Sequence, residues 1–255
     1  MSESIQINQR DRIVELVMHR PEKKNALTGD MYAEMARAIA AAQDDPAARV
    51  VLISGSPDCF TAGNDVGDFL NNPPKGDDAP VWAFLAAIAK SRKPLVAAVE
   101  GLAVGIGTTM LMHCDLVYAG RSARLQLPFV RLGLCPEAAS SLMLPALAGY
   151  QRAAEALLLG KPFSADKAVQ MGLINELVDD GQALAHARQI AAELAALPPD
   201  AVITSKKLLR QVHAAEIDRV MSEEARDFLR LLEGEEAREA VNAFLEKRQP
   251  DFSRF

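Results

Sequence analysis

Glu137 is the residue whose type and surroundings could most readily do chemistry. It lies in the stretch LGLCPEAASS (132–141), directly after Pro136 and among small and apolar residues. A carboxyl group in such surroundings can have a raised pKa and act as a general base. The alternative is structural, because Pro136 suits the first position of a helix and the helix dipole favours an acid in the first turn. Taken alone, the stretch favours the structural interpretation.

Two turns rich in small residues could offer backbone N–H groups to a ligand. They are FTAGNDV (60–66) and GLAVGIG (101–107). Amides at such turns, or near a helix N-terminus, can be left unpaired and face a bound group. The alternatives are an ordinary tight turn in the first segment and close packing of a strand against a helix in the second. A dinucleotide fingerprint is only weakly indicated, because Met110 occupies the place of a third glycine after Gly105 and Gly107.

The elements expected around these segments indicate an α/β protein in which each segment follows a strand. Short apolar runs predict five strands, at residues 13–18, 49–54, 95–99, 115–119 and 123–127, and INELV (174–178) predicts a brief sixth. Thr28 is a suitable N-cap for a helix after the first strand. Beyond residue 150 the pattern is mostly helical, and Pro198–Pro199 interrupts it. We place a domain boundary there, which gives a core of residues 1–197 and a helical region of residues 198–255.

Composition excludes several classes of function. The chain has 255 residues and a net charge of −6, which argues against general nucleic-acid binding. Its three cysteines and four histidines show no metal-type spacing, so we expect no metal site and a reduced, cytoplasmic protein. We see no secretory leader and no apolar run of the ~18 residues that cross a membrane, so we expect no membrane association.

With RPEKKNAL (20–27) and FLEKRQPDF (244–252), the three segments together resemble the crotonase, or enoyl-CoA hydratase/isomerase, superfamily. Each motif is loose, but the five occur in register over nearly the whole chain. The resemblance implies an α/β spiral of ββα units, followed by a helical region that assembles a homotrimer or a dimer of trimers. It also implies an acyl-CoA thioester as substrate, with no separate cofactor because coenzyme A is part of that substrate.

The resemblance implies an oxyanion hole made by the backbone N–H groups of Asn64 and Ile106. Losing one such donor typically costs ~10²–10³ in rate. Further residues are implied to contact coenzyme A or the acyl group, the last two from a neighbouring subunit: Lys24, Ala26, Ala62, Gly63, Asp65, Val66, Gly105, Phe244 and Lys247. For the lysines, a solvated surface is the alternative. Phe69, Trp82 and Phe84 could line an acyl tunnel or belong to the core.

Differences from the family pattern narrow the expected chemistry. Hydratases of the family carry two carboxylates, at the positions that Thr109 and Phe129 occupy here. The two acids normally share the work of positioning water and delivering a proton to carbon. Glu137 lies in a context similar to that of peroxisomal Δ3,Δ2-enoyl-CoA isomerases, in which a glutamate is the sole base. The resemblance therefore implies that Glu137 moves a proton from C2 to C4 of a 3-enoyl-CoA.

Two other functions stay open at this point. One is an enoyl-CoA hydratase, or another acyl-CoA lyase or hydrolase, on the same scaffold; the other is a non-catalytic acyl-CoA-binding scaffold that has lost its acids. The pKa of Glu137 is also open. Apolar neighbours such as Phe129, Leu132 and Leu134 would raise it, whereas a helix N-terminus would lower it.

Overall fold

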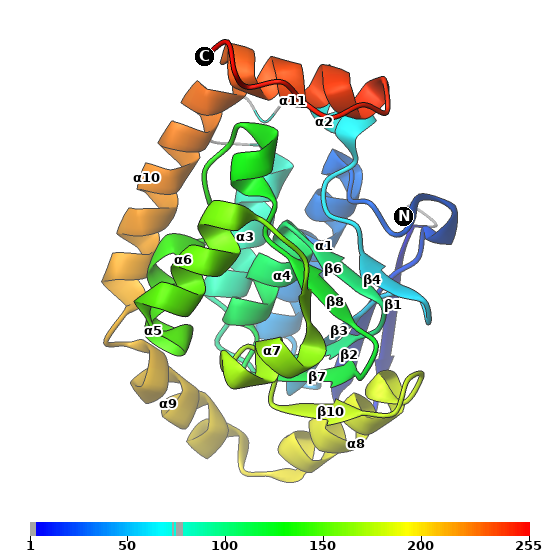
Figure 1. Ribbon diagram of the computed structural model, residues 1–255. Coiled ribbons are helices and arrows are strands. Elements are labelled where there is room, and N and C mark those ends of the chain that lie inside the picture. Colours follow the sequence, from blue (N-terminus) through cyan, green and yellow to red (C-terminus); the bar gives the residue numbers. More distant parts are fainter. Residues whose placement is uncertain (1–3, 73, 75–78) are drawn as a thin grey trace.

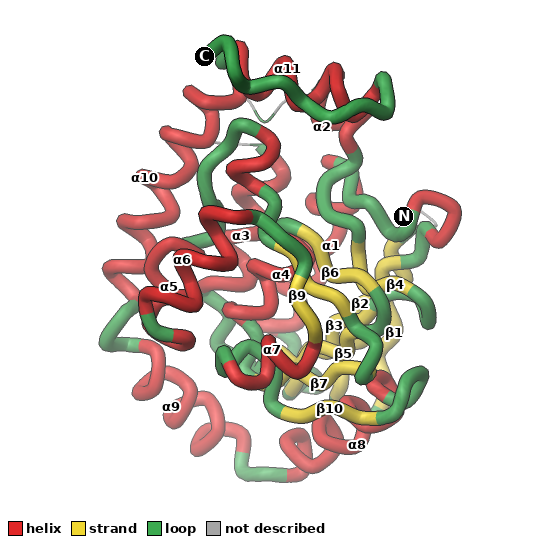
Figure 2. Tube along the Cα trace, viewed as in Figure 1, coloured by secondary structure: helices red, strands yellow, loops and turns green. Residues whose placement is uncertain are grey.

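Two β-sheets lie at the centre of the computed structural model, which describes residues 4–72, 74 and 79–255. The larger sheet has the strand order β1-β2-β3-β5-β7-β10, and the smaller has the order β4-β6-β8-β9. The strands are β1 (Ile5–Arg10), β2 (Ile13–Met18), β3 (Val50–Ser54), β4 (Cys59–Thr61), β5 (Leu95–Val99), β6 (Leu102–Val104), β7 (Leu116–Gly120), β8 (Arg124–Gln126), β9 (Phe163–Ser164) and β10 (Glu176–Val178). Figure 2 shows the strands gathered at the right of the view, with helices to their left, above and below.

The helices lie in the chain between the strands and after the last strand, β10. The α-helices are α1 (Gly29–Asp44), α2 (Val66–Asn71), α3 (Pro80–Ala89), α4 (Ile106–Thr109), α5 (Ser140–Ala148), α6 (Tyr150–Leu159), α7 (Ala165–Gln170), α8 (Ala183–Ala196), α9 (Pro199–Arg210), α10 (Ala214–Leu232) and α11 (Glu235–Leu245). Three 3-10 helices are η1 (Pro21–Lys23), η2 (Met110–His113) and η3 (Phe129–Leu132). In Figure 1, α9, α10 and α11 run around the outside of the molecule.

Successive pairs of strands are divided between the two sheets. β3, β5 and β7 enter the larger sheet, and the strand after each of them, β4, β6 and β8, enters the smaller one. Neighbours among these strands are parallel in both sheets. The carboxyl ends of β4 and β6 therefore lie side by side, and so do the turns that follow them. This arrangement confirms the expected α/β spiral of ββα units.

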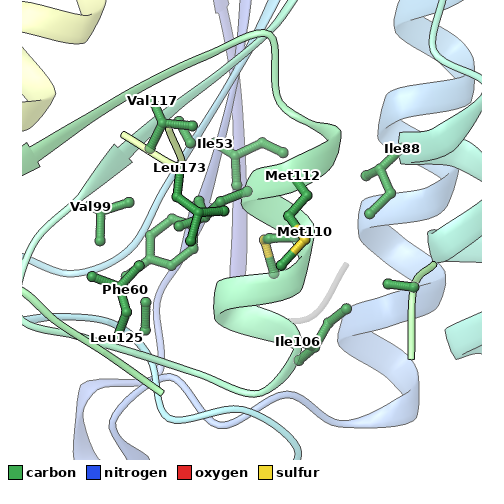
Figure 3. Close-up of a cluster of buried hydrophobic side chains, with 14 of the residues drawn as sticks. Ile53, Phe60, Ile88, Val99, Ile106, Met110, Met112, Val117, Leu125 and Leu173 are labelled. Atoms are coloured by element: carbon green, nitrogen blue, oxygen red, sulfur yellow. The ribbon is translucent and has the colours of Figure 1, made fainter. Parts of the chain in front are cut away.

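Apolar side chains on both faces of the larger sheet explain why its central strands are continuously apolar. Every residue of β3 and β5 is buried, as is typical of parallel strands covered on both sides. One face packs against α8 through alanines spaced four residues apart: Ala183, Ala187, Ala191 and Ala195. The other face belongs to the main core, where Ile53 and Val99 lie with Ile106, Met110 and Ile88 (Figure 3).

The sequence signal for the start of α1 is confirmed, and the one expected at Pro136 is wrong. The Thr28 side chain accepts a hydrogen bond from Met31 N, which makes it the N-cap of α1. Pro136, however, does not begin a helix, because α5 starts only at Ser140. Ala138 and Ala139 before it have φ values of 59° and 56°, in the left-handed region. Glu137 therefore lies in an irregular segment, not in a first helical turn.

Candidate active site

The turn after β4 leaves one amide free. The amides around Asn64 are bonded within the protein: Ala62 N donates to Lys24 O (2.9 Å), Gly63 N to Thr61 Oγ1 (3.1 Å) and Asp65 N to Leu27 O (2.9 Å). Within the described part of the chain, the N–H of Asn64 itself has no acceptor. Its side chain is held from the other side, because Tyr32 of α1 donates to Asn64 Oδ1. This turn can therefore present the Asn64 N–H to a ligand.

The turn after β6 leaves a second amide free, at the start of α4. Gly105 has φ 56° and ψ −118°, a conformation open mainly to glycine, and its own N–H donates to Gln126 O at 2.9 Å. The first amides of a helix have no intrahelical acceptor, and the N–H of Ile106 finds none elsewhere among the described residues. The Ile106 side chain is 2% exposed and points into the core (Figure 3). The side chain is thus anchored while the amide stays available.

Glycines allow these two turns to touch. A Cβ atom on Gly63 would lie 2.9 Å from the carbonyl oxygen of Val104, and one on Gly107 would lie 2.5 Å from Thr61 Cγ2. The turn after β4 thus contacts the end of β6, and α4 contacts the end of β4. The geometry brings together the two positions expected to form the oxyanion hole, Asn64 and Ile106.

We expect Gly63→Ala to destabilise the protein by about 1–3 kcal/mol, because alanine would be strained at φ 90° and would press against Val104 O. In a thermal melt this corresponds to a Tm lower by several degrees. Gly67→Ala in α2 is the matched control, since its Cβ would meet only the Asp65 side chain, at 3.3 Å. Equal melting temperatures for the two variants would contradict the close contact of the turns.

Glu137 is a buried carboxyl group attached to this same region. It is 8% exposed, and the hydroxyl of Thr109 donates to its Oε1. Thr109 ends α4, whose first residue is Ile106, so a single helical turn links the free amide to the glutamate. Thr109, which the sequence shows only as a missing acid, is the hydrogen-bond partner of Glu137.

Burial decides the proton affinity of Glu137. Loss of solvation raises its pKa from 4.5 to about 8; the hydrogen bond from Thr109 opposes this rise, and the nearby carboxyl group of Glu224 adds to it. Phe129 and Leu134 are buried in the adjacent core as expected. Leu132 is 37% exposed, and its share in the desolvation of Glu137 stays a prediction. Glu137 does not lie in the first turn of a helix, because α5 starts at Ser140.

The stretch 20–27 is tied to the first turn by two side chains that the sequence does not single out. Asn25 is fully buried, and its Nδ2 donates to Cys59 O at 2.7 Å. Arg20 donates to Asp65 Oδ2 at 2.7 Å and to Ala26 O at 3.0 Å. The structure thereby brings together the expected contacts around this turn: Lys24, Ala26, Ala62, Gly63, Asp65 and Val66.

The remaining residues expected to contact the substrate lie partly on the surface and partly in the core. Phe244 is 60% exposed and lies near the end of α11, and Lys247 follows on the exposed surface. Phe84 is fully buried and its ring centroid lies 5.5 Å from that of Tyr32, so it belongs to the core. Trp82 is partly buried against the same core. The side chain of Phe69 falls outside the described part of the structure.

Other kinds of site can be assessed over the same residues. No group of three or more His, Cys, Asp or Glu side chains in the described ranges is arranged to hold a metal ion. None of the helices that the structure describes has the length and apolar character needed to span a membrane.

Known proteins resemble this chain over almost its whole length. Residues 8–254 match the family model described as enoyl-CoA hydratase/isomerase. The 2,3-dehydroadipyl-CoA hydratase of Escherichia coli is 33% identical, with 99% of each chain covered. Human enoyl-CoA delta isomerase 2 is 32% identical, with 96% of this chain and 64% of the human protein covered. The solved structure of Pseudomonas aeruginosa OdaA is 48% identical, with 96% of this chain and 99% of that chain covered and a TM-score of 0.94. The sequence match, the spiral fold and the paired turns agree: the chain belongs to the enoyl-CoA hydratase/isomerase family of the crotonase superfamily.

Proposed function

We propose that this protein is a Δ3,Δ2-enoyl-CoA isomerase in which Glu137 is the only acid–base group. The observation that carries the proposal is the buried carboxyl group of Glu137, with a pKa raised to about 8, hydrogen-bonded to the helix that begins with the free amide of Ile106. The residues at the two hydratase acid positions, Thr109 and Phe129, cannot act as acids or bases. Similarity to human enoyl-CoA delta isomerase 2 is compatible with this reaction.

The proposed reaction needs two amides and one carboxylate. The N–H groups of Asn64 and Ile106 donate to the thioester oxygen and stabilise the negative charge that develops there. Ionised Glu137 takes a proton from C2, and the electrons of that C–H bond spread into a dienolate. The same carboxyl group then returns the proton to C4, which leaves the double bond between C2 and C3. The Thr109 hydroxyl stabilises the ionised form of Glu137 before the first transfer and after the second. Between the two transfers the carboxyl group carries the proton.

We also propose how the rest of the substrate is held. Exposed Lys24, at the end of η1, lies near the nucleotide end of coenzyme A, and Ala62 and Asp65 border the turn beside it. Phe244 and Lys247 reach the same ligand from a neighbouring subunit of a homotrimer or a dimer of trimers. The protein acts in the cytoplasm.

Hydration is the competing function, because relatives such as the 2,3-dehydroadipyl-CoA hydratase of Escherichia coli carry that activity in their names. Purified protein should convert trans-3-hexenoyl-CoA to the 2-enoyl product and should hydrate crotonyl-CoA at least ~10²-fold more slowly, since water has no second acid to position it. Chromatography of the acyl-CoA products distinguishes the two reactions. Efficient hydration of crotonyl-CoA would assign the site to the competing function.

The same assay has a pH signature. A carboxyl group with a pKa of about 8 is about one tenth ionised at pH 7 and about nine tenths ionised at pH 9, and only the ionised form accepts a proton. The kcat/KM for isomerisation should therefore rise about tenfold between these pH values. A flat profile would mean that the base in the free enzyme does not titrate near pH 8, and would contradict the raised pKa of Glu137.

A further inference from the structure

A second buried carboxyl group, Glu224, holds the segment that carries Glu137. Glu224 is 7% exposed and comes from α10, which packs beside the start of α5 (Figure 1). Its Oε2 accepts a hydrogen bond from Ala139 N at 2.6 Å, and its Oε1 accepts one from Ser141 N at 2.9 Å. The carboxyl group thus binds the N-terminus of α5, the position where a negative charge is favoured.

The backbone between Glu137 and α5 needs such support. Ala138 and Ala139 both lie in the left-handed region, which is unfavourable for a residue with a Cβ atom. Buried His113 fixes one side of this kink by donating from Nε2 to Ala138 O at 2.8 Å; burial lowers the pKa of His113 to about 4, so the ring is neutral. Glu224 fixes the other side through Ala139 N. Together these two bonds hold a conformation that the alanines do not favour by themselves.

We propose that Glu224 is a positioning residue for the reaction: by holding the Ala138–Ala139 kink, it fixes where the carboxyl group of Glu137 points. The inference rests on the proposed role of Glu137 as the base. It goes beyond that role because it assigns a function to α10, which lies in the helical C-terminal part of the chain.

The charge of Glu224 has a separate, measurable effect. Glu224 from α10 raises the pKa of Glu137. Tyr32 from α1 also faces Glu137, and its own pKa is raised well above 10, first by burial and then by Glu137. His113 stays neutral beside them. Cys135 has a pKa raised to about 11, first by burial and then by Glu224. Burial raises the pKa of Glu224 itself, whereas its hydrogen bonds from Ser141 N and Ala139 N favour its ionised form. Ionised Glu224 disfavours ionisation of Glu137, so removing that charge should lower the pKa of Glu137.

The first test compares Glu224→Gln with Glu223→Gln. Both variants remove one negative charge from adjacent positions of α10, but Glu223 is exposed and pairs with Arg219 at 2.7 Å. Carboxyl groups labelled with ¹³C would be titrated by NMR, with the Glu137 signal assigned from its absence in Glu137→Gln. We expect the Glu137 midpoint to fall by about 0.5–1 pH unit in Glu224→Gln and to stay unchanged in Glu223→Gln.

The second test separates geometry from charge. Glu224→Asp keeps the charge but is one methylene shorter. It should therefore leave the titration midpoint of Glu137 near the wild-type value. The kcat for trans-3-hexenoyl-CoA should nevertheless fall about tenfold or more, with KM nearly unchanged. This variant also serves if Glu224→Gln does not fold. Wild-type kcat in Glu224→Asp, or equal Glu137 midpoints in Glu224→Gln and Glu223→Gln, would overturn the inference. Because the titration needs no turnover, a protein that titrates as expected but isomerises nothing would refute the proposed function and leave the contact intact.

Discussion

Replacing Glu137 with glutamine should lower kcat/KM for trans-3-hexenoyl-CoA by ~10²–10⁴-fold, the range expected when a general acid–base group is lost. Glutamine has nearly the same shape, and its amide oxygen can still accept the hydrogen bond from Thr109. The site should therefore keep its form and its affinity for acyl-CoA while losing the proton carrier. Steady-state rates together with calorimetric binding of a saturated acyl-CoA measure both effects. Isomerisation by the variant at the wild-type rate would exclude Glu137 as the base.

The same variant carries its own control for folding. The pKa of Glu137 in the folded protein, about 8, lies above its ordinary value of 4.5, so the folded chain binds this proton more tightly than the unfolded chain. Stability is therefore lost as pH rises from about 4.5 to about 8, and glutamine, which cannot ionise, avoids that loss. We expect the Tm of Glu137→Gln relative to wild type to be higher at pH 8.5 than at pH 5. A loss of activity with this gain in stability cannot come from unfolding.

Replacing Ile106 with proline should lower kcat/KM by ~10²–10³-fold, because it removes one of the two amides proposed to bind the thioester oxygen. Ile106 is the first residue of α4, a position where helices tolerate proline, and its N–H has no acceptor among the described residues. Steady-state kinetics with a 3-enoyl-CoA would measure the loss.

Ile106→Ala is the matched control for the proline variant. It keeps the amide and removes more of the buried side chain, so it should cost stability, about 2–5 kcal/mol, with a smaller loss of rate at a temperature where it is folded. Similar rates in the two variants would assign the effect to packing and contradict a role for the amide.

The sequence predicts those features of the site that depend on neighbouring residues, and misses those that depend on contacts from distant parts of the chain. The glycines on both sides of Ile106 indicate from neighbouring residues that its amide is free, whereas the choice of Asn64 within its small-residue turn comes from the family resemblance. The same local rules fail at Pro136, because the left-handed alanines that delay α5 are held by contacts from outside the segment. Thr109 looks like a lost acid until the fold places it against Glu137.

The residues that sequence reasoning misses all act across long separations in the chain. Glu224 reaches Ala139 from 85 residues away, and Arg20 reaches Asp65 from 45 residues away. Nothing in the charge-rich pattern of α10 distinguishes Glu224 from its exposed neighbours, because only packing against α5 buries it. A single sequence shows which residue types are present, and the long-range pairing emerges only with the fold.

The link between α10 and the kink after Glu137 limits how freely this enzyme can be recombined. A chimera joined at Pro198–Pro199 would keep both sheets, both free amides and Glu137, yet it would take residue 224 from the other parent. If that parent has no acid of the same reach there, the hybrid would keep the groups proposed to react but would lose the contact that holds the segment of Glu137. On the proposed role of Glu224, α10 and the segment of Glu137 must therefore be exchanged between relatives as one unit.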